Sequence, residues 1–304
     1  MSASAAGRQG ALLRAMPIVF VLIWSTGFIV ARFGMPHSPP LTFLSMRYAF
    51  SLLCFGVWIA LRGVPWPRER AQWAHLAAVG VLIHAGYLGG VWAAVKSGIG
   101  AGTVALLVGL QPVLTALWMS GQSRIGYTRA RILPQQWGGL ALGLGGLTLV
   151  VWHKLGGGEV THWNLALAIV ALLSITIGTL YQKRFVLPCD VRTASAIQLF
   201  AALAVSLPLA LFETEPVVWH PEMIGALGWS VLVLTLGGSS LLYLLIQRGA
   251  ATEVTSLMYL VPPCTATLAW LLFGEAFTWS MGAGMLLTAT GVALVVRTPL
   301  RRTA

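Results

Sequence analysis

The sequence predicts an all-α integral membrane protein with ten transmembrane helices in two inverted five-helix repeats. Three observations lead to this prediction: the composition, a series of long apolar segments, and the alternation of charge between the loops. Hydrophobic residues make up 57% of the 304 residues and charged residues only 9%, whereas roughly 25% of the residues in a soluble protein are charged. Soluble enzymes, nucleic-acid-binding proteins and disordered proteins are thereby excluded.

The apolar segments are long enough to cross a bilayer, which takes about 20 residues per helix. The first segment follows Arg8 and Arg14 and is longer than the apolar part of a usual signal peptide, so we expect a retained helix. The loops that remain are too short for a second, soluble domain. The expected helices cover residues 15–34, 40–61, 71–95, 99–119, 135–153, 163–182, 193–212, 222–247, 254–273 and 278–296.

Basic residues lie mainly on one side of this predicted topology. If the N-terminus is cytoplasmic, only Arg32, Lys96 and Lys154 fall outside and Arg47 falls within a span. Cytoplasmic loops of membrane proteins are rich in Lys and Arg, so both termini are predicted to be cytoplasmic and the number of helices even. The other fifteen of the 19 Lys and Arg residues are Arg8, Arg14, Arg62, Arg68, Arg70, Arg124, Arg129, Arg131, Lys183, Arg184, Arg192, Arg248, Arg297, Arg301 and Arg302.

The net charge of +11 therefore reflects topology, and no nucleic-acid partner is predicted. Three cysteines, Cys54, Cys189 and Cys264, lie far apart and form no C-x-x-C pair. Such spacing gives no disulfide framework and no metal site. We predict neither a metal nor a cofactor.

An internal repeat relates the two halves of the chain. Residues 107–119 resemble residues 257–269, and Pro112 aligns with Pro262 at an offset of 150 residues. A chance likeness of apolar segments is the alternative interpretation, and the paired prolines argue against it.

A second pair of segments extends the repeat. Residues 139–151 resemble residues 284–296, both rich in glycine, at an offset of 145 that fits an insertion in the first half. Five helices is an odd number, so the second repeat starts on the opposite side of the membrane, as in transporters whose central site opens to each side in turn. The predicted repeats are residues 1–153 and 154–304.

Several short motifs resemble the EamA type of the drug/metabolite transporter superfamily. This resemblance covers nearly the whole chain and implies five-plus-five inverted repeats, a central cavity and the export of amino acids or other metabolites. One departure is that Arg129-Ala130 stands where a Gly-Glu pair often follows helix 4. The matching motifs are Trp24-Ser25-Thr26-Gly27, Arg47-Tyr48, Gly109-Leu110-Gln111-Pro112, Val261-Pro262 and Phe273-Gly274-Glu275.

Polar side chains within the spans are the best guide to a substrate site, because burying them in a bilayer is costly. Arg47 either fixes helix packing or attracts a substrate carboxylate. His84 and Tyr87 lie one turn apart among small glycines, which suggests a concave polar wall, although a lone buried histidine is often a core residue. The predicted substrate-binding residues are Trp24, Arg47, His84, Tyr87, Trp92, Gln111, Tyr181, Tyr243 and Tyr259.

Two prolines within spans are predicted gating kinks. Proline removes a helical hydrogen bond and can free a carbonyl group for a substrate. Pro112 lies beside Gln111, and Pro262 takes the matching position in the second half. A purely structural kink is the alternative.

Acidic residues are almost absent from the spans. Asp190, the only aspartate, lies in a predicted cytoplasmic loop, and Glu253 and Glu275 lie at helix ends. Proton-coupled transport commonly uses an acidic relay in the membrane, so His84, an end-of-helix glutamate or no coupling at all is expected.

We therefore predict a plasma (inner) membrane transporter that exports a small metabolite, such as an amino acid, by alternating access. Efflux of drugs or other toxic amphipathic compounds is the alternative. An intramembrane enzyme is disfavoured because no G-x-S-x-G or H-E-x-x-H motif is present, and a channel because no ring of like residues is visible. The expected partners are a small molecule and lipid, with the chain a monomer or weak homodimer.

Overall fold

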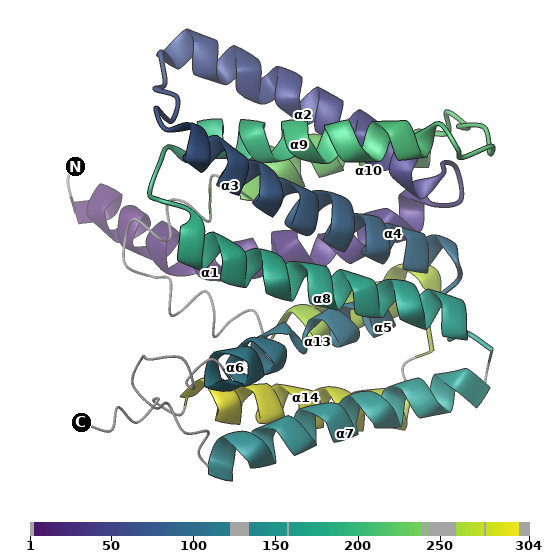
Figure 1. Cartoon of the computed structure of the whole chain (residues 1–304). Coiled ribbons are helices and arrows are strands. Elements are labelled where there is room, and N and C mark those ends of the chain that lie inside the picture. Colours follow the sequence, from purple (N-terminus) through teal and green to yellow (C-terminus); the bar gives the residue numbers. More distant parts are fainter. Residues whose placement is uncertain are drawn as a thin grey trace.

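The computed structural model describes residues 3–121, 134–156, 158–238, 241, 260–276 and 278–297. Within these ranges the regular structure is helical throughout, with no strand. The long helices lie side by side, and α1 begins at the end of the molecule where α14 ends (Figure 1). The elements are α1 (Ala3–Gly34), α2 (Pro40–Arg62), α3 (Arg70–Gly80), η1 (Val81–Leu88), α4 (Gly89–Lys96), α5 (Ala101–Val108), α6 (Gln111–Gly121), α7 (Pro134–Gly156), α8 (His162–Phe185), α9 (Val191–Ala210), α10 (Pro221–Trp229), η3 (Ser230–Gly237), α13 (Val261–Phe273) and α14 (Trp279–Arg297).

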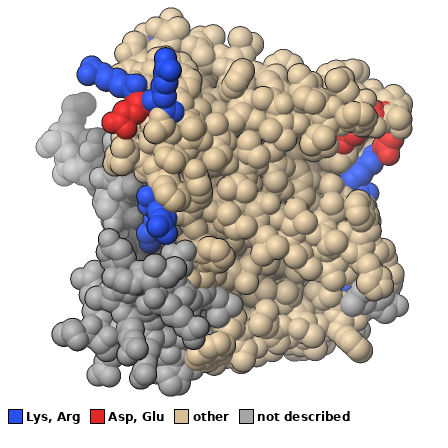
Figure 2. Space-filling view, in the orientation of Figure 1, with Lys and Arg blue, Asp and Glu red and all other residues tan. Residues whose placement is uncertain are grey.

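Four of the described helices are long and apolar enough to cross a membrane, namely Pro40–Arg62, Arg70–Lys96, His162–Phe185 and Val191–Ala210. A broad uncharged band covers the middle of the molecule, and charged side chains gather toward its two ends (Figure 2). Water-facing proteins do not leave such a band uncharged. The predicted all-helical membrane protein is thus confirmed. Shorter apolar helices cover Ile18–Gly34, Ala101–Thr115, Trp137–Trp152, Pro221–Gly237 and Val261–Phe273.

Helix ends fall where proline and glycine predict them. Pro40 occupies the first turn of α2, where its missing N–H is not needed. Gly63 ends α2 with φ 58° and Gly274 ends α13 with φ 65°, left-handed conformations that only glycine adopts easily. At the start of α8, Thr161 and Asn164 form a capping box.

The helix expected over residues 99–119 is interrupted. α5 ends at Val108 and α6 starts at Gln111, with Pro112 in its first turn. α13 also starts with proline, because Pro262 follows Val261. The two proline sites are close in space: a Cβ on Gly109 would lie 3.1 Å from Pro262 Cγ.

Two of the described helices contain an eight-residue π-helical segment. The first, η1, joins α3 to α4, and the second, η3, continues α10. In η3 the Thr235 hydroxyl donates to the carbonyl of Ser230, five residues earlier, at 2.8 Å. Such segments widen a helix locally and occur frequently at functional sites.

α7 and α14 pack closely and antiparallel at one side of the bundle (Figure 1). Glycines allow the contact: a Cβ on Gly146 would lie 2.5 Å from the Gly284 carbonyl oxygen, and one on Gly291 would lie 2.3 Å from that of Gly139. Between these contacts, Thr288 Oγ1 donates to the Gly143 carbonyl at 3.4 Å. Small residues at helix interfaces let membrane helices approach each other in this way.

Candidate functional site

Arg47 and Tyr48, neighbours on α2, connect the two π-helical segments. Arg47 donates through both Nε and Nη2 to Thr235 Oγ1 of η3, each at 3.2 Å. Tyr48 donates its hydroxyl to the His84 carbonyl of η1 at 2.8 Å. The exposed fraction is 7% for Arg47 and 0% for Tyr48. α2 therefore joins two segments whose backbones both depart from the α-helical pattern.

The charge of Arg47 has no carboxylate partner among the described residues, where every ion pair involves other side chains. A buried charge is costly unless it is paired. Besides Thr235, the polar groups near this guanidinium include Tyr48, Tyr87 and His84, none of which is a carboxylate. A negatively charged ligand would supply the charge that these groups lack.

Three buried hydroxyl groups have no hydrogen-bond partner among the described residues: those of Ser45 and Ser51, which are near Arg47 along the chain, and that of Ser230, which is near Thr235. Ser51 lies one turn from Arg47 on the same face of α2. Ser230 is the residue whose carbonyl accepts from Thr235. Buried polar atoms in proteins are nearly always paired with protein, water or ligand, so these unpaired hydroxyls distinguish the polar region around Arg47 and Thr235.

Two of the predicted site residues, His84 and Tyr87, lie together in η1 beside Arg47. The His84 side chain also interacts with Gln198 of α9, and the ring centroids of His84 and Tyr48 are 6.1 Å apart. Sequence analysis did not single out Gln198 or Thr235. Both are ordinary polar residues in apolar helices, and only their long-range partners distinguish them.

The remaining predicted residues make separate contacts. Trp92 is buried and stacks on Phe43 with ring centroids 4.4 Å apart, and Trp24 packs on Phe20. Gln111 donates to the Thr179 hydroxyl of α8 at 3.1 Å. The Tyr181 hydroxyl lies 2.9 Å from His75 Nδ1. Tyr243 and Tyr259 fall outside the described residues.

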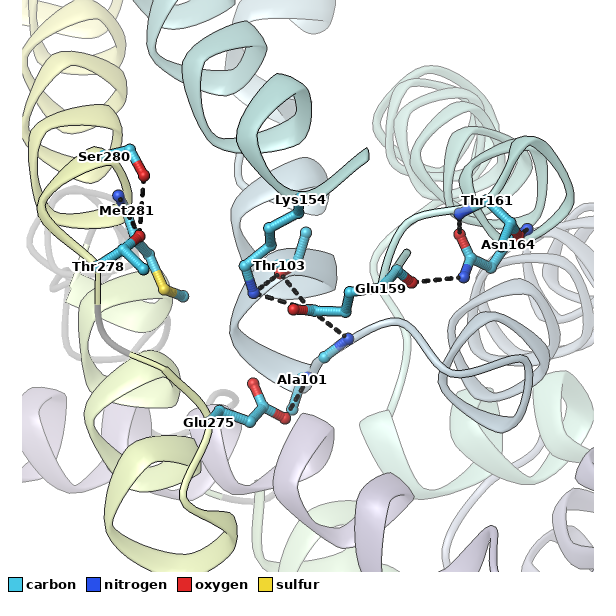
Figure 3. A network of polar contacts seen from close by, with 11 residues as sticks. Ala101, Thr103, Lys154, Glu159, Thr161, Asn164, Glu275, Thr278, Ser280 and Met281 are labelled. Atoms are coloured by element: carbon cyan, nitrogen blue, oxygen red, sulfur yellow. Dashed lines mark hydrogen bonds and ion pairs between the residues drawn. The ribbon is translucent and has the colours of Figure 1, made fainter. Parts of the chain in front are cut away.

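A second polar network surrounds the start of α5 (Figure 3). Glu159 Oε1 accepts from Lys154 Nζ at 2.8 Å and from the Gly100 N–H at 3.0 Å. Glu275 Oε1 accepts from the Ala101 N–H at 3.1 Å. The carboxylates satisfy free N–H groups at the positive end of the helix dipole. Glu275 thereby ties the loop after α13 to α5 through Oε1, whereas its Oε2 is buried without a hydrogen-bond partner among the described residues.

A third group of contacts, which we call the end clasp, joins the α1–α2 connection to the α9–α10 connection. Glu213 caps the start of α2, accepting from the N–H groups of Leu41 at 2.9 Å and Thr42 at 2.7 Å. The Val218 N–H donates to the His37 carbonyl at 2.8 Å. The end clasp consists of Met35, His37, Leu41, Thr42, Lys96, Glu213, Glu215 and Val218, with Lys96 bonded to the Met35 carbonyl and paired with Glu215.

The arrangement of this bundle is shared with known proteins. The profile of the EamA-like transporter family matches residues 13–152 and again residues 162–297. The chain belongs to the EamA-like transporter family. It is a membrane transporter, as the resemblance implied, and not an enzyme.

Relatives of this EamA-like transporter carry transporter names. An uncharacterized inner membrane transporter, YedA, of Escherichia coli K12 is 26% identical over 84% of this chain and 81% of its own. A probable amino-acid metabolite efflux pump of Salmonella typhimurium LT2 is 24% identical, over 95% of this chain and 96% of its own length. One solved crystal structure has the same fold, with a TM-score of 0.63 at 18% identity over 92% of this chain and 96% of that one.

Proposed function

We propose that this transporter exports a small metabolite bearing a carboxylate, such as an amino acid, by alternating access around a central cavity. The observation that carries the proposal is the buried Arg47, which lacks a described carboxylate partner and bonds to η3 while its neighbour Tyr48 bonds to η1. A substrate carboxylate bound there neutralises the guanidinium. Charge-assisted hydrogen bonds of this kind are about twice as strong as neutral ones. His84 and Tyr87 form part of the same polar wall.

The ten helices of the proposal form two inverted repeats, residues 1–153 and 154–304. At the offset of 145 residues, Gly139 corresponds to Gly284 and Gly146 to Gly291. The contact of Gly146 with Gly284 then corresponds to that of Gly291 with Gly139, and both are close. A two-fold axis relating antiparallel helices produces such exchanged pairs, so the α7–α14 interface supports an inverted repeat.

The broken helices supply the moving parts. η1 and η3 begin at Val81 and Ser230, an offset of 149 residues that agrees with the repeat. Pro112 follows the break between α5 and α6, and Pro262, in the first turn of α13, lies against this break at Gly109. Backbone that is not fully hydrogen-bonded can change conformation at low cost, so these breaks are the gating positions. The predicted lining residues Trp24, Trp92, Gln111, Tyr181, Tyr243 and Tyr259 remain part of this proposal.

The protein resides in the plasma (inner) membrane with both termini cytoplasmic, as a monomer or weak homodimer. Support comes from the charge distribution between loops and from the relative named as an inner membrane transporter. α1 begins and α14 ends at the same end of the molecule (Figure 1), which agrees with an even number of spans. The relatives named probable amino-acid metabolite efflux pumps support the substrate class.

Counterflow in liposomes tests the proposal. Vesicles containing the purified protein are loaded with a pool of unlabelled amino acids, and entry of labelled ones is followed with and without a pH gradient. We expect saturable exchange of at least one amino acid that protein-free vesicles lack. Exchange of amphipathic dyes but of no amino acid would favour drug efflux, and chemical conversion of the compound would contradict a transporter.

A further inference from the structure

Two histidines and one glutamate from distant parts of the chain meet beside the end clasp. His37 lies in the connection after α1, whereas His220 caps the start of α10 and Glu222 lies in its first turn. His37 Nε2 is 3.1 Å from Glu222 Oε2, and His220 Nδ1 is 3.9 Å from the same oxygen. The two imidazole rings stack with centroids 4.5 Å apart. One donor atom from each residue lies within 4.8 Å of those of the other two.

This donor set suits a divalent transition-metal ion. Imidazole is a common ligand of zinc, and two histidines with one carboxylate leave a fourth, open position for water. Zinc–nitrogen and zinc–oxygen bonds of about 2.0–2.2 Å place neighbouring donors of a tetrahedron roughly 3.3 Å apart. The observed separations of 3.1 and 3.9 Å bracket this value. Magnesium, which prefers oxygen ligands, suits the site poorly.

The surroundings also favour a cation. Glu213, Glu215 and Glu222 lie within one short stretch, and Lys96 is paired with Glu215. Side-chain exposures of 49% for His220 and 50% for Glu222 leave both groups open to water. His220 Nδ1 also accepts from the Glu222 N–H at 3.4 Å, a contact that a bound ion would replace. The His37 side chain is more buried, at 18%, and its backbone carbonyl is held by Val218. One ligand is therefore on a fixed segment and two are exposed.

We propose that His37, His220 and Glu222 form a binding site for one zinc ion or a similar transition-metal ion. The ligands come from both halves of the chain, so a bound ion crosslinks the α1–α2 connection to the start of α10. This crosslink reinforces the end clasp and holds that end of the molecule closed. Metal binding then slows the transport cycle, a consequence that rests on the proposed function, whereas the site itself does not.

Zinc binding to the purified full-length protein, prepared without a polyhistidine tag, tests the site. Isothermal titration calorimetry with ZnCl₂ is expected to give one site per chain, with no comparable heat for MgCl₂. His37→Ala and His220→Ala are expected to weaken binding about tenfold or more, since even supporting residues contribute 10–100-fold to metal affinity. His162→Ala is the matched control, because His162 is an exposed histidine at the start of α8.

His37→Cys separates loss of a ligand from loss of folding, because cysteine is also a zinc ligand. This variant is expected to retain zinc binding and the zinc-dependent rise in melting temperature, which His37→Ala lacks. Wild-type protein that binds no zinc, or His37→Ala and His220→Ala variants that bind as wild type, would overturn the site.

The effect on transport is measured separately in the counterflow assay. Zinc is expected to slow exchange by wild type and by His162→Ala, and to leave His37→Ala unaffected. Exchange that ignores zinc while calorimetry shows it bound would overturn the crosslinking role. Absence of any exchange in metal-free protein counts against the proposed function and leaves the calorimetric result standing.

Discussion

At the scale of single residues, Arg47 connects structure most directly to transport. It is the cation that the sequence places within a span, and its structural partner is a hydroxyl group of η3. A neutral partner does not offset the cost of burying the charge. The free energy that Arg47 gains from its contacts in the folded protein therefore does not offset the cost of burying its charge, which favours a role in binding.

Replacing Arg47 tests this role. Arg47→Gln keeps a hydrogen-bond donor for Thr235 but removes the charge. We expect amino-acid exchange in liposomes to fall at least ~10-fold, because losing one charged hydrogen bond to the substrate costs about 1.5 kcal/mol of binding free energy. Arg47→Lys should retain part of the activity. Arg62→Gln, at the exposed end of the same helix, is the control and should exchange normally. Wild-type exchange by Arg47→Gln would remove Arg47 from the site.

Asp190 contributes to stability in a pH-dependent way. Its carboxylate accepts hydrogen bonds from the Arg192 side chain at 3.0 and 2.8 Å, which lowers the pKa of Asp190 below its ordinary value. The charged form is thus favoured in the folded state, so its contribution is present above about pH 4 and is lost as the pH falls through the folded-state pKa.

Asp190→Asn retains an acceptor for the Arg192 N–H at the start of α9 but removes the charge. We expect this variant to be less stable than wild type by about 0.5–1 kcal/mol at pH 7, with the difference shrinking below about pH 4. Melting temperatures in detergent across pH measure this. A difference that grows in acid would contradict the ion pair.

The sequence predicts Arg47, His84 and Tyr87 as site residues because polar groups stand out in apolar helices, and the structure brings the three near one another. Sequence reasoning did not reach Thr235 or the clasp glutamate Glu213. Their partners lie 188 and about 170 residues away along the chain, and no local pattern reports such a distance. The assignment of Tyr243 and Tyr259 stays a prediction.

At the scale of elements, the break before Pro112 and the start of α13 at Pro262 are the expected hinges. Pro112→Ala restores an N–H group and lets a helix extend across the break at residues 109–110, and Pro262→Ala restores an N–H group in the first turn of α13, since proline disfavours a continuous helix. We expect each variant to lower the maximal exchange rate several-fold while KM changes less than about twofold, because bound geometry is kept and opening is slowed. Unchanged rates in both would leave only a packing role.

The α7–α14 interface gives a second prediction for elements. A side chain at Gly146 would meet the Gly284 carbonyl oxygen at 2.5 Å, whereas one at Gly145 meets nothing within 4 Å. Gly146→Leu should destabilise the protein by about 1–3 kcal/mol through overpacking, seen as a lower melting temperature in detergent. Gly145→Leu is the matched control and should melt as wild type. Equal melting temperatures for the two variants would contradict the close packing.

Element boundaries followed from proline, glycine and charged residues, as at Pro40 and Gly63. The π-helical segments and the break at residues 109–110 did not, because apolar sequence of the same composition forms either a regular or a widened helix. Packing against another element decides between them: η1 contacts α8 through Gly86 and Ser174. A single sequence does not contain that information.

At the scale of the whole molecule, the repeat and the membrane topology depend on each other. The likeness of residues 139–151 to 284–296 predicted a relation between α7 and α14, and the structure packs these two helices together. The prediction of which side of the membrane each end faces rests on charge alone, since fifteen of 19 basic residues lie in the segments that it assigns to the cytoplasm.

Reporter fusions test this topology and the inverted repeat together. Alkaline phosphatase is active only outside the cytoplasm, so its fusions after residue 304 and in the α2–α3 connection should be inactive, whereas fusions in the α9–α10 connection, beside the end clasp, should be active. A green fluorescent protein should show the reverse pattern. An active phosphatase at the C-terminus would make the number of spans odd. The two halves could not then be inverted five-helix units, and the pairing of Gly146–Gly284 with Gly139–Gly291 would need another explanation.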